Sequence, residues 1–269
     1  MLNNKNILIT GGTGSFGNAF CKYVTKKYKK IKKVVIYSRD EFKQYQMQKL
    51  FPYKNFRFYL GDVRDKSRLL RALDTIDYVI HAAGYNGGIE FNRMYPADIL
   101  YSNSIMALNI HHACEYTGVK KLINIMTSCA YPDTGMEVLK EDTFWNGLPN
   151  KTIRAHGIAK RILQAASEAY NEQYEFNSVS VCVTNLYGPH DTFNLVRTKV
   201  VGALIRKFVE AVIDENDQVE CWGTGAPMRE FMYVEDAAEA IVLALQNYED
   251  NTTPLNIGTG KDISIKTLV

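Results

Sequence analysis

The sequence predicts an α/β protein built on a doubly wound parallel sheet, with a smaller C-terminal cap. Three observations carry this prediction. Apolar strand segments alternate with helical segments along the chain, with no internal repeat and no linker rich in Pro, Ser or Gly. The first strand leads directly through a glycine-rich turn into a helix. With 269 residues, 46% of them hydrophobic, the chain is long enough to bury a large core.

The expected strands are short apolar runs bounded by polar residues: Asn6–Thr10, Lys33–Tyr37, Phe56–Leu60, Tyr78–His81, Lys121–Met126, Asn177–Thr184 and Gln218–Trp222. The clearest of the helices between them are Ser67–Ala72, Pro96–Thr117, Arg154–Gln173, Thr198–Val212 and Val234–Gln246. We expect residues 1–187 to form the main domain, with 230–250 packing back on it. Residues 188–229 and 251–269 would form the cap.

The turn after the first strand has the features of a dinucleotide-binding site. Only glycine lets backbone N–H groups approach a pyrophosphate closely where a helix begins. The second strand ends about twenty residues after the last glycine, as this motif requires. An ordinary glycine-rich turn is the alternative, but the order of strand, turn and helix favours a Rossmann domain. The residues of the turn expected to contact the cofactor are Gly11, Thr13, Gly14, Ser15, Phe16 and Gly17.

The end of the second strand indicates which nicotinamide cofactor is bound. Ser38 and Arg39 stand where an acidic residue would accept a hydrogen bond from a free ribose 2′-hydroxyl. Because an arginine pairs with a 2′-phosphate and a serine can donate to it, NADP is favoured. The alternative is that Arg39 is a solvated charge and that Asp40 or Glu41 turns inward to hold NAD.

Further cofactor contacts are expected at the ends of the third and fourth strands. Asp62 and Val63 follow the third strand, where a carboxylate can accept a hydrogen bond from the adenine amino group. Ala82, Ala83 and Gly84 follow the fourth, where small residues leave room for the ribose and pyrophosphate.

Composition excludes several other classes of protein. The net charge of +3 is too small to indicate a nucleic-acid partner, and the clustered lysines from Lys26 to Lys33 suit a helix C-terminus. No apolar run approaches the ~20 residues that span a bilayer, so we expect no membrane association and a cytoplasmic protein. Five scattered cysteines argue against a disulfide framework and against a metal site.

These motifs resemble the extended short-chain dehydrogenase/reductase family, the NAD-dependent epimerases and dehydratases of nucleotide sugars. Within it the likeness is strongest to the GDP-L-fucose synthase group, whereas the first eighty residues look more like UDP-N-acetylglucosamine 4,6-dehydratases. The segments that carry the resemblance are Thr10–Gly17, Asp62, His81–Gly84, Thr127–Pro132, Lys160, Asn185–Asp191, Trp222–Gly225, Met228–Phe231 and Asn256–Gly260.

The resemblance implies a hydroxyl, a tyrosine and a lysine around the nicotinamide. Thr127 and Lys160 match, with Lys160 also contacting the cofactor ribose, but His156 stands where the tyrosine belongs. An imidazole titrates near neutral pH, so His156 can still exchange a proton with a sugar oxygen, directly or through water. The alternative is that hydride transfer is lost and that His156 only fills space.

The pair that family members use for epimerisation is present as Cys129 and His190. A C4 ketone acidifies the protons on C3 and C5, and inversion needs one group to remove a proton and another to return one. A packed thiol and a loop histidine are the alternatives. By the same likeness, Asn185, Trp222, Arg229 and Lys199 would contact the substrate, although Lys199 can also be a surface charge.

The resemblance therefore implies an NADP-dependent epimerase/reductase of a nucleotide-diphosphate 4-keto-(6-deoxy)hexose. A 4,6-dehydratase is disfavoured because Thr127–Cys129 contains no acid, and a non-catalytic binding protein is the other alternative. The relatives pair as homodimers through the helices expected at Pro96–Thr117 and Arg154–Gln173. A serine-capped helix begins near the last residues and stops within about two turns, so we expect a truncated cap.

Overall fold

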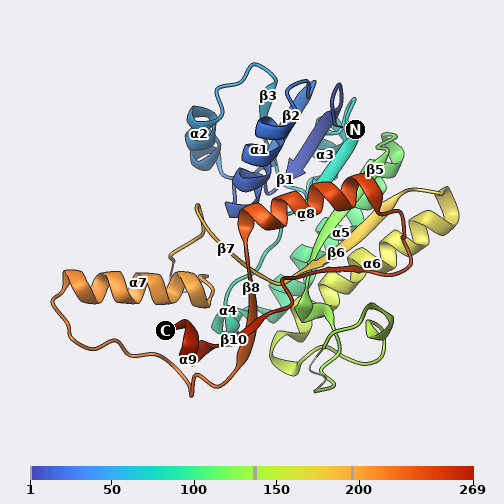
Figure 1. The fold of residues 1–269 in the computed structure, drawn as a ribbon. Helices are drawn as coiled ribbons and strands as arrows, with labels where there is room; N and C mark the ends of the chain where they lie inside the picture. The colour runs from blue at the N-terminus through green and yellow to red at the C-terminus, as the bar shows by residue number, and fades with distance from the viewer. Residues whose placement is uncertain (1, 136–137, 195–196) are drawn as a thin grey trace.

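The computed structural model describes residues 2–135, 138–194 and 197–269 (Figure 1). Its large sheet has seven parallel strands in the order β3-β2-β1-β4-β5-β6-β9. The strands of this sheet are β1 (Asn6–Thr10), β2 (Lys33–Ser38), β3 (Phe56–Leu60), β4 (Tyr78–His81), β5 (Lys121–Thr127), β6 (Ser178–Val183) and β9 (Leu255–Ile257). The strand order reverses between β1 and β4, which opens the crevice where ligands bind in this architecture.

Helices cover both faces of the large sheet. One face carries α1 (Ser15–Lys27), α2 (Glu41–Leu50) and α8 (Val234–Asn247), and the other carries α3 (Lys66–Ala72), α5 (Pro96–Tyr116) and α6 (Arg154–Tyr174). Side chains alternate between the two layers because successive strand residues point to opposite faces. In β1, Ile7 and Ile9 are buried with the first layer and Leu8 with the second.

Local sequence signals explain where these helices begin. Asp40 caps α2 by accepting a hydrogen bond from the backbone N–H of Lys43 at 2.9 Å, and Asp65 caps α3 in the same way. Pro96 occupies the first turn of α5, where its missing N–H costs nothing. Within the described residues, no helix combines the length and the apolar character that a membrane crossing requires.

A smaller sheet lies beyond the carboxyl ends of the large one. It consists of β7 (Asn185–Tyr187), β8 (Met228–Tyr233) and β10 (Asp262–Ser264), with β8 parallel to β7 and antiparallel to β10. Figure 1 shows α7 (Val200–Ile213) on this side of the molecule, away from the large sheet. The remaining short helices are α4 (Ile89–Met94), α9 (Ile265–Leu268) and the 3₁₀ turns η1 (Ser128–Ala130), η2 (Glu141–Thr143) and η3 (Lys151–Ile153).

The structure confirms the predicted doubly wound α/β fold and corrects one strand. Residues 218–222 form no strand; β9 pairs with β6 at that edge of the large sheet instead. β9 therefore lies in the main sheet although its residues were expected in the cap, and β7 lies in the small sheet although its residues were expected in the main domain. The expected serine cap at Ser264 is present, and α8 packs against α1.

Candidate active site

The glycine turn brings α1 against the crevice between β1 and β4. Gly11 has φ +65°, and a Cβ there would lie 2.9 Å from Cα of Ala83. A Cβ on Gly17 would lie 2.1 Å from the carbonyl oxygen of Gly12. Side chains are therefore excluded at both positions. Gly14 precedes α1 and offers no side-chain cap, so the first N–H groups of the helix remain open to an anion.

A buried hydrogen-bond chain joins the ends of β1 and β4. Thr10 Oγ1 lies 2.8 Å from Nδ1 of His81 and accepts a hydrogen bond from the N–H of Ala83 at 3.2 Å. Burial lowers the pKa of His81 well below its ordinary value, and the charge of Lys160 adds to this shift. His81 is therefore neutral at physiological pH. Ala82, Ala83 and the exposed Gly84 continue from this chain into the crevice.

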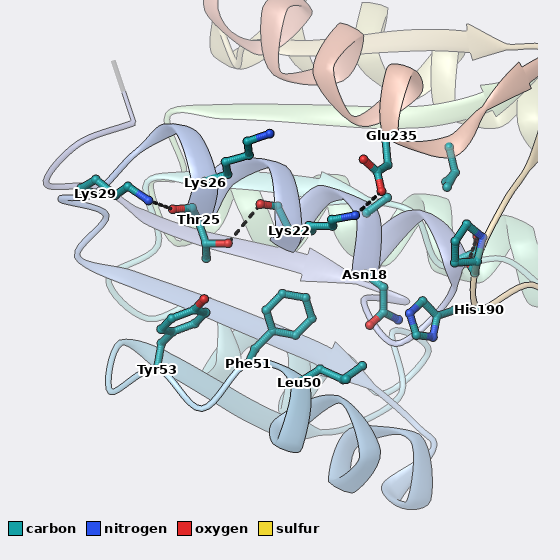
Figure 2. Close-up of a pocket in the computed structure, with 14 residues that line it drawn as sticks. Asn18, Lys22, Thr25, Lys26, Lys29, Leu50, Phe51, Tyr53, His190 and Glu235 are labelled. Carbon is teal, nitrogen blue, oxygen red and sulfur yellow. Dashed lines mark hydrogen bonds and ion pairs between the residues drawn. The ribbon is translucent and has the colours of Figure 1, made fainter.

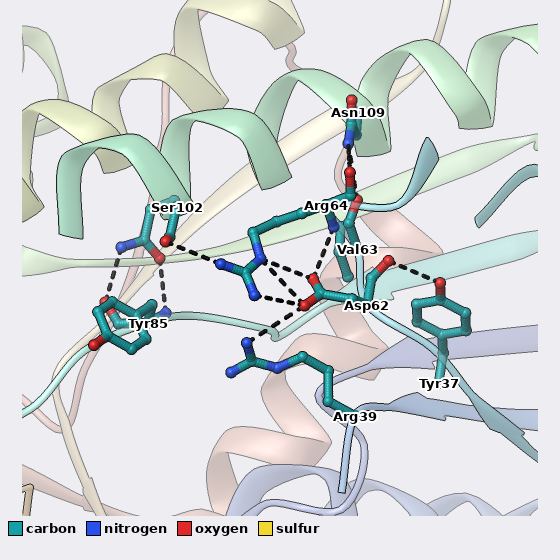
Figure 3. Close-up of polar contacts among 9 residues, drawn as sticks. Tyr37, Arg39, Asp62, Val63, Arg64, Tyr85, Ser102 and Asn109 are labelled. Carbon is teal, nitrogen blue, oxygen red and sulfur yellow. Dashed lines mark hydrogen bonds and ion pairs between the residues drawn. The ribbon is translucent and has the colours of Figure 1, made fainter. Parts of the chain in front are cut away.

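Two arginines share one carboxylate at the far end of the crevice (Figure 3). Arg64 donates to Asp62 through its backbone N–H, Nε and Nη2, the last at 2.7 Å, whereas Arg39 Nη1 makes a single contact at 3.4 Å. Partial burial raises the pKa of Asp62, but the hydrogen bonds and charges of the arginines outweigh it and hold that pKa below its ordinary value. Arg39 is thus the less firmly held guanidinium, and its side chain is half exposed.

The other residues expected at this end are arranged differently. Ser38 is buried, and its hydroxyl accepts a hydrogen bond from Nε2 of Gln44 at 3.0 Å, which leaves Arg39 as the accessible member of the pair. Of the two candidates for holding NAD, Asp40 is engaged as the cap of α2, and Glu41 is the exposed first residue of that helix. Val63 is buried, and its carbonyl oxygen accepts a hydrogen bond from the Asn109 side chain.

The carboxyl end of β5 packs tightly against the start of α6. Thr127 Oγ1 accepts a hydrogen bond from the N–H of Cys129 at 3.4 Å, which fixes the turn η1. A Cβ on Gly157 would lie 2.5 Å from the carbonyl oxygen of Cys129, so the helix can approach η1 only because this residue is glycine. Cys129 itself is half-buried, unlike the buried Cys182 on the neighbouring strand.

Lys160 projects from α6 into the crevice. Its Nζ donates to the carbonyl oxygen of Ile125 at 3.0 Å and lies 4.0 Å from the position that a Cβ on Gly84 would take. Burial lowers the pKa of Lys160 to about 8; Cys182 opposes this shift and Lys199 adds to it. The ammonium therefore begins to lose its proton close to physiological pH.

His156 lies one helical turn before Lys160 and is 3% exposed. Its Nδ1 is buried and has no hydrogen-bond partner among the described residues. Burial lowers the pKa of His156 to about 3, and the charges of Lys160 and Lys199 contribute. The imidazole is consequently neutral throughout the physiological range.

His190 lines a groove along α1 (Figure 2). The groove has a volume of about 500 Å³, and Figure 2 shows His190 beside Asn18. His190 has φ +64°, a left-handed conformation that is uncommon outside glycine. No hydrogen bond or ion pair among the described residues joins His190 to Cys129. His190 lines the α1 groove, whereas Cys129 is not among the residues that line it.

The expected substrate residues lie around the small sheet. The Asn185 side chain donates to the carbonyl oxygen of Glu230 at 3.0 Å. Trp222 is 81% exposed, with the Lys207 ammonium 4.6 Å from its ring centre, and Arg229 is exposed. Lys199 precedes α7 and is near enough to lower the pKa values of His156 and Lys160.

Sequence reasoning missed two contacts that shape the crevice. Asn103, buried in α5, accepts a hydrogen bond from the N–H of Tyr85 at 2.9 Å and donates to its carbonyl oxygen at 2.8 Å, which clamps the segment after β4. The Arg197 guanidinium lies 5.5 Å from the ring centre of Tyr85 and 5.4 Å from that of Phe91. The available signal was an asparagine on the same helical face as the apolar residues Ile99, Met106 and Ile110. Among the residues described, no group of three or more His, Cys, Asp or Glu side chains is placed to hold a metal.

Comparison with known proteins agrees with this geometry. Residues 7–258 match the NAD dependent epimerase/dehydratase family. The chain is 40% identical over 205 residues to the GDP-L-fucose synthase of Escherichia coli (strain K12), an alignment that covers 73% of this chain and 64% of that protein. It is 41% identical to the GDP-L-fucose synthase of Sinorhizobium fredii over 70% of this chain and 59% of that one. The chain thus spans less than two thirds of the length of these relatives.

Solved structures give the same picture. A GDP-L-fucose synthetase from Naegleria fowleri bound to NADP superposes with a TM-score of 0.81 at 29% identity, covering 98% of this chain and 75% of that one. A GDP-6-OMe-4-keto-L-xylo-heptose reductase from C. jejuni superposes with a TM-score of 0.83 at 25% identity, covering 100% of this chain and 82% of that one.

Proposed function

Because this chain belongs to the NAD dependent epimerase/dehydratase family, we propose that it acts on a nucleotide-diphosphate 4-keto-6-deoxyhexose as an NADP-dependent epimerase/reductase. Its relatives carry the name GDP-L-fucose synthase, which makes a GDP-linked sugar the first substrate to test. The observation that carries the proposal is the position of Lys160. Its buried ammonium lies at the carboxyl end of β5 and faces the loop at Gly84, beside the turn that bears Cys129.

The residues of the crevice fit an NADP cofactor. The Gly11 cradle, which a Cβ would fill, and the uncapped start of α1 suit a pyrophosphate. Arg39, held by one long contact to Asp62, is free to pair with a 2′-phosphate. Lys160 has donors left over after its bond to Ile125 and would hold the nicotinamide ribose. When bound, the reduced cofactor supplies a hydride to the sugar ketone.

Epimerisation would use Cys129 and His190. A C4 ketone makes the neighbouring C–H groups acidic, and a thiol and an imidazole on opposite faces can remove and return the proton. Cys129 is half-buried at the crevice, whereas His190 would have to turn out of the α1 groove to reach the same sugar. The left-handed backbone at His190, which follows Gly188 at φ +150°, marks the segment that would rearrange.

The substrate would lie between the crevice and the small sheet. We assign Arg229 and Lys199 to the diphosphate, since both are exposed cations on this side of the molecule. Asn185 would hydrogen-bond the sugar or pyrophosphate, and the exposed ring of Trp222 would cover the base or the sugar.

We also propose that two copies associate through α5 and α6. The outer side of α5 carries Tyr101, 66% exposed, and Leu108, 49% exposed, with the half-buried Ile105 between them on the same helical face. Apolar side chains exposed at such spacing suit a helix that packs against another helix. The mass of the protein in solution, measured by light scattering, tests this assignment.

One incubation tests the proposed function. The protein is mixed with NADPH and a GDP-4-keto-6-deoxyhexose in deuterated water, while absorbance reports NADPH oxidation and mass spectrometry reports deuterium in the sugar. We expect both signals. Deuterium uptake without NADPH oxidation would reduce the proposal to an epimerase. Binding of NADPH with neither signal would indicate a non-catalytic binding protein and overturn the proposal.

A further inference from the structure

The proposed reduction needs a proton for the sugar oxygen. The resemblance described above places a tyrosine at position 156 of α6, and this chain has a histidine there. This histidine lies four residues before Lys160, so both side chains project from the same face of α6. A neutral imidazole can donate its N–H hydrogen, but it must regain a proton on its other nitrogen to remain neutral.

His156 is badly placed to act as a charged acid by itself. The ring is buried, and Lys160 and Lys199 place two positive charges within range of it. A third positive charge in this cluster is strongly opposed, since no carboxylate of the described residues is among the groups that shift the pKa of His156. Its Nδ1 nevertheless lacks a partner among the described residues, so this nitrogen remains open to a hydrogen bond.

Lys160 is better suited to supply the proton than His156. Its ammonium has three N–H donors, and in the described part of the chain it donates to one acceptor, the carbonyl oxygen of Ile125. Two titratable groups shift its pKa, Cys182 of β6 and Lys199 before α7. The charge of Lys160 in turn lowers the pKa values of His156 of α6 and His81 of β4. Burial and Lys199 both favour loss of its proton.

We propose that Lys160 is the proton donor of the site and that the neutral imidazole of His156 passes its proton to the carbonyl oxygen of the substrate. This inference rests on the proposed function. The carbonyl π bond opens as a hydride from the reduced nicotinamide reaches carbon, and the oxygen takes the N–H proton of His156. The other ring nitrogen takes a proton from Lys160, so the imidazole changes tautomer without becoming charged. Lys160 ends as a neutral amine and regains its proton from solvent.

Chemical rescue by amines tests the donor directly. Lys160→Ala should lower the rate of NADPH oxidation at saturating cofactor by about 10²-fold or more, the usual size of a general-acid effect. Added ethylamine and weaker bases such as ethanolamine should restore activity, and at equal ammonium concentration the stronger acid should restore more. Lys151→Ala, an exposed lysine on η3 just before α6, serves as control and should show neither loss nor rescue.

A second readout does not depend on turnover. Reductive methylation with ¹³C-formaldehyde gives each lysine an NMR signal, and the Lys160 signal is identified by its loss in Lys160→Arg. We expect this signal to titrate near pH 8, apart from the exposed lysines. A midpoint in the ordinary range of about 10, or amine rescue that ignores acid strength, would overturn the role of Lys160 while leaving the proposed function intact. Absence of NADPH oxidation by the unmodified protein would overturn both.

Discussion

Ser15 Oγ donates a hydrogen bond to the carbonyl oxygen of Pro189 at 2.6 Å. This bond joins the first turn of α1, where a pyrophosphate would be held, to the residue that precedes His190. It accounts for the position of His190 beside α1, because Pro189 and His190 both line the α1 groove together with Ser15. This hydrogen bond therefore couples the position of His190 to the first turn of α1.

Proton exchange at the sugar should survive without NADPH, because Cys129 and His190 need only a C4 ketone to act. We expect the protein to exchange C3 or C5 protons of a 4-keto sugar nucleotide with deuterated water. Cys129→Ser should slow the exchange by at least about 10²-fold, and His190→Asn should act in the same direction. The exposed Cys221→Ser is the matched control and should exchange normally. Exchange that persists in both active-site variants would remove the two residues from the mechanism.

Cofactor choice should depend on Arg39. NADPH should bind more tightly than NADH, because a charge-assisted pair with the 2′-phosphate contributes roughly 1.5–3 kcal/mol, or about 10- to 100-fold in affinity. Arg39→Asp should reverse much of this preference. Arg71→Asp changes an exposed arginine on α3 and should leave the preference unchanged. Fluorescence titration of both cofactors gives the comparison, and equal affinities in the unmodified protein would contradict the assignment of NADP.

Gly11→Ala should lower the free energy of unfolding by more than the left-handed backbone at Gly11 alone accounts for. Gly11 and Gly118 have similar φ values, +65° and +73°, but a Cβ on Gly118 meets nothing within 4 Å. Gly118→Ala should therefore cost about 1 kcal/mol of unfolding free energy from the left-handed backbone alone. Gly11→Ala adds the collision with Ala83 and should lose more stability and most NADPH affinity. Urea unfolding and cofactor titration of both variants measure the difference, and equal losses would show that the close approach is unimportant.

The large sheet was predictable because its strands are apolar runs that alternate with helices. The strands β1, β2, β4, β5 and β6 are buried almost throughout, so their sequences carry a strong signal. The small sheet and the edge strand β9 of the large sheet were not predictable: β7, β9 and β10 have three residues each and are mostly half-buried, and most of β8 is exposed or half-buried. Such short segments gain their structure from pairing with distant strands, which local sequence does not specify.

Some residues of the site could be predicted from the sequence, and others could be placed only from the folded chain. Gly11 follows β1, Thr127 is the last residue of β5, and Lys160 lies near the start of α6, all elements that could be located from the sequence. The pairing of Arg39 with Asp62 joins residues 23 positions apart, and only the folded chain reveals that Arg64 already holds that carboxylate. The position of His190 depends on a left-handed loop conformation and on the bond from Ser15, neither of which its motif indicates. The domain boundaries, the dimer and the cytoplasmic location remain predictions.

Acid should destabilise the protein partly through His111. This residue is buried between α5 and α6, with Nδ1 2.8 Å from the carbonyl oxygen of Ala107, and burial lowers its pKa to about 4. The unfolded chain binds this proton near pH 6.5, so stability is retained above that pH and lost as pH falls from about 6.5 to 4. The loss at pH 5 should be about 2 kcal/mol.

Urea unfolding of His111→Gln at pH 7.5 and pH 5 measures this contribution. The variant should be less stable at pH 7.5 but should lose less on acidification than the unmodified protein. His112→Gln, at the half-buried neighbouring position, is the control and should keep the original acid sensitivity. Identical acid sensitivity in both variants would show that His111 does not titrate on unfolding.

The rate of NADPH oxidation should depend on pH through Lys160 and should also depend on the residue at position 156. A donor must be protonated to act, so the rate of NADPH oxidation should be high below pH 8 and fall as pH rises through about 8, where Lys160 loses its proton. His156→Phe should lower the rate by about 10²-fold without weakening NADPH binding, because the relay is lost. His156→Tyr should preserve or raise the rate, since its phenol can donate beside Lys160. Tyrosine is nearly the same size as the phenylalanine of the other variant. The difference between these two variants isolates the hydroxyl from the change in volume. If His156→Phe turns over like the unmodified protein, the proton does not pass through position 156.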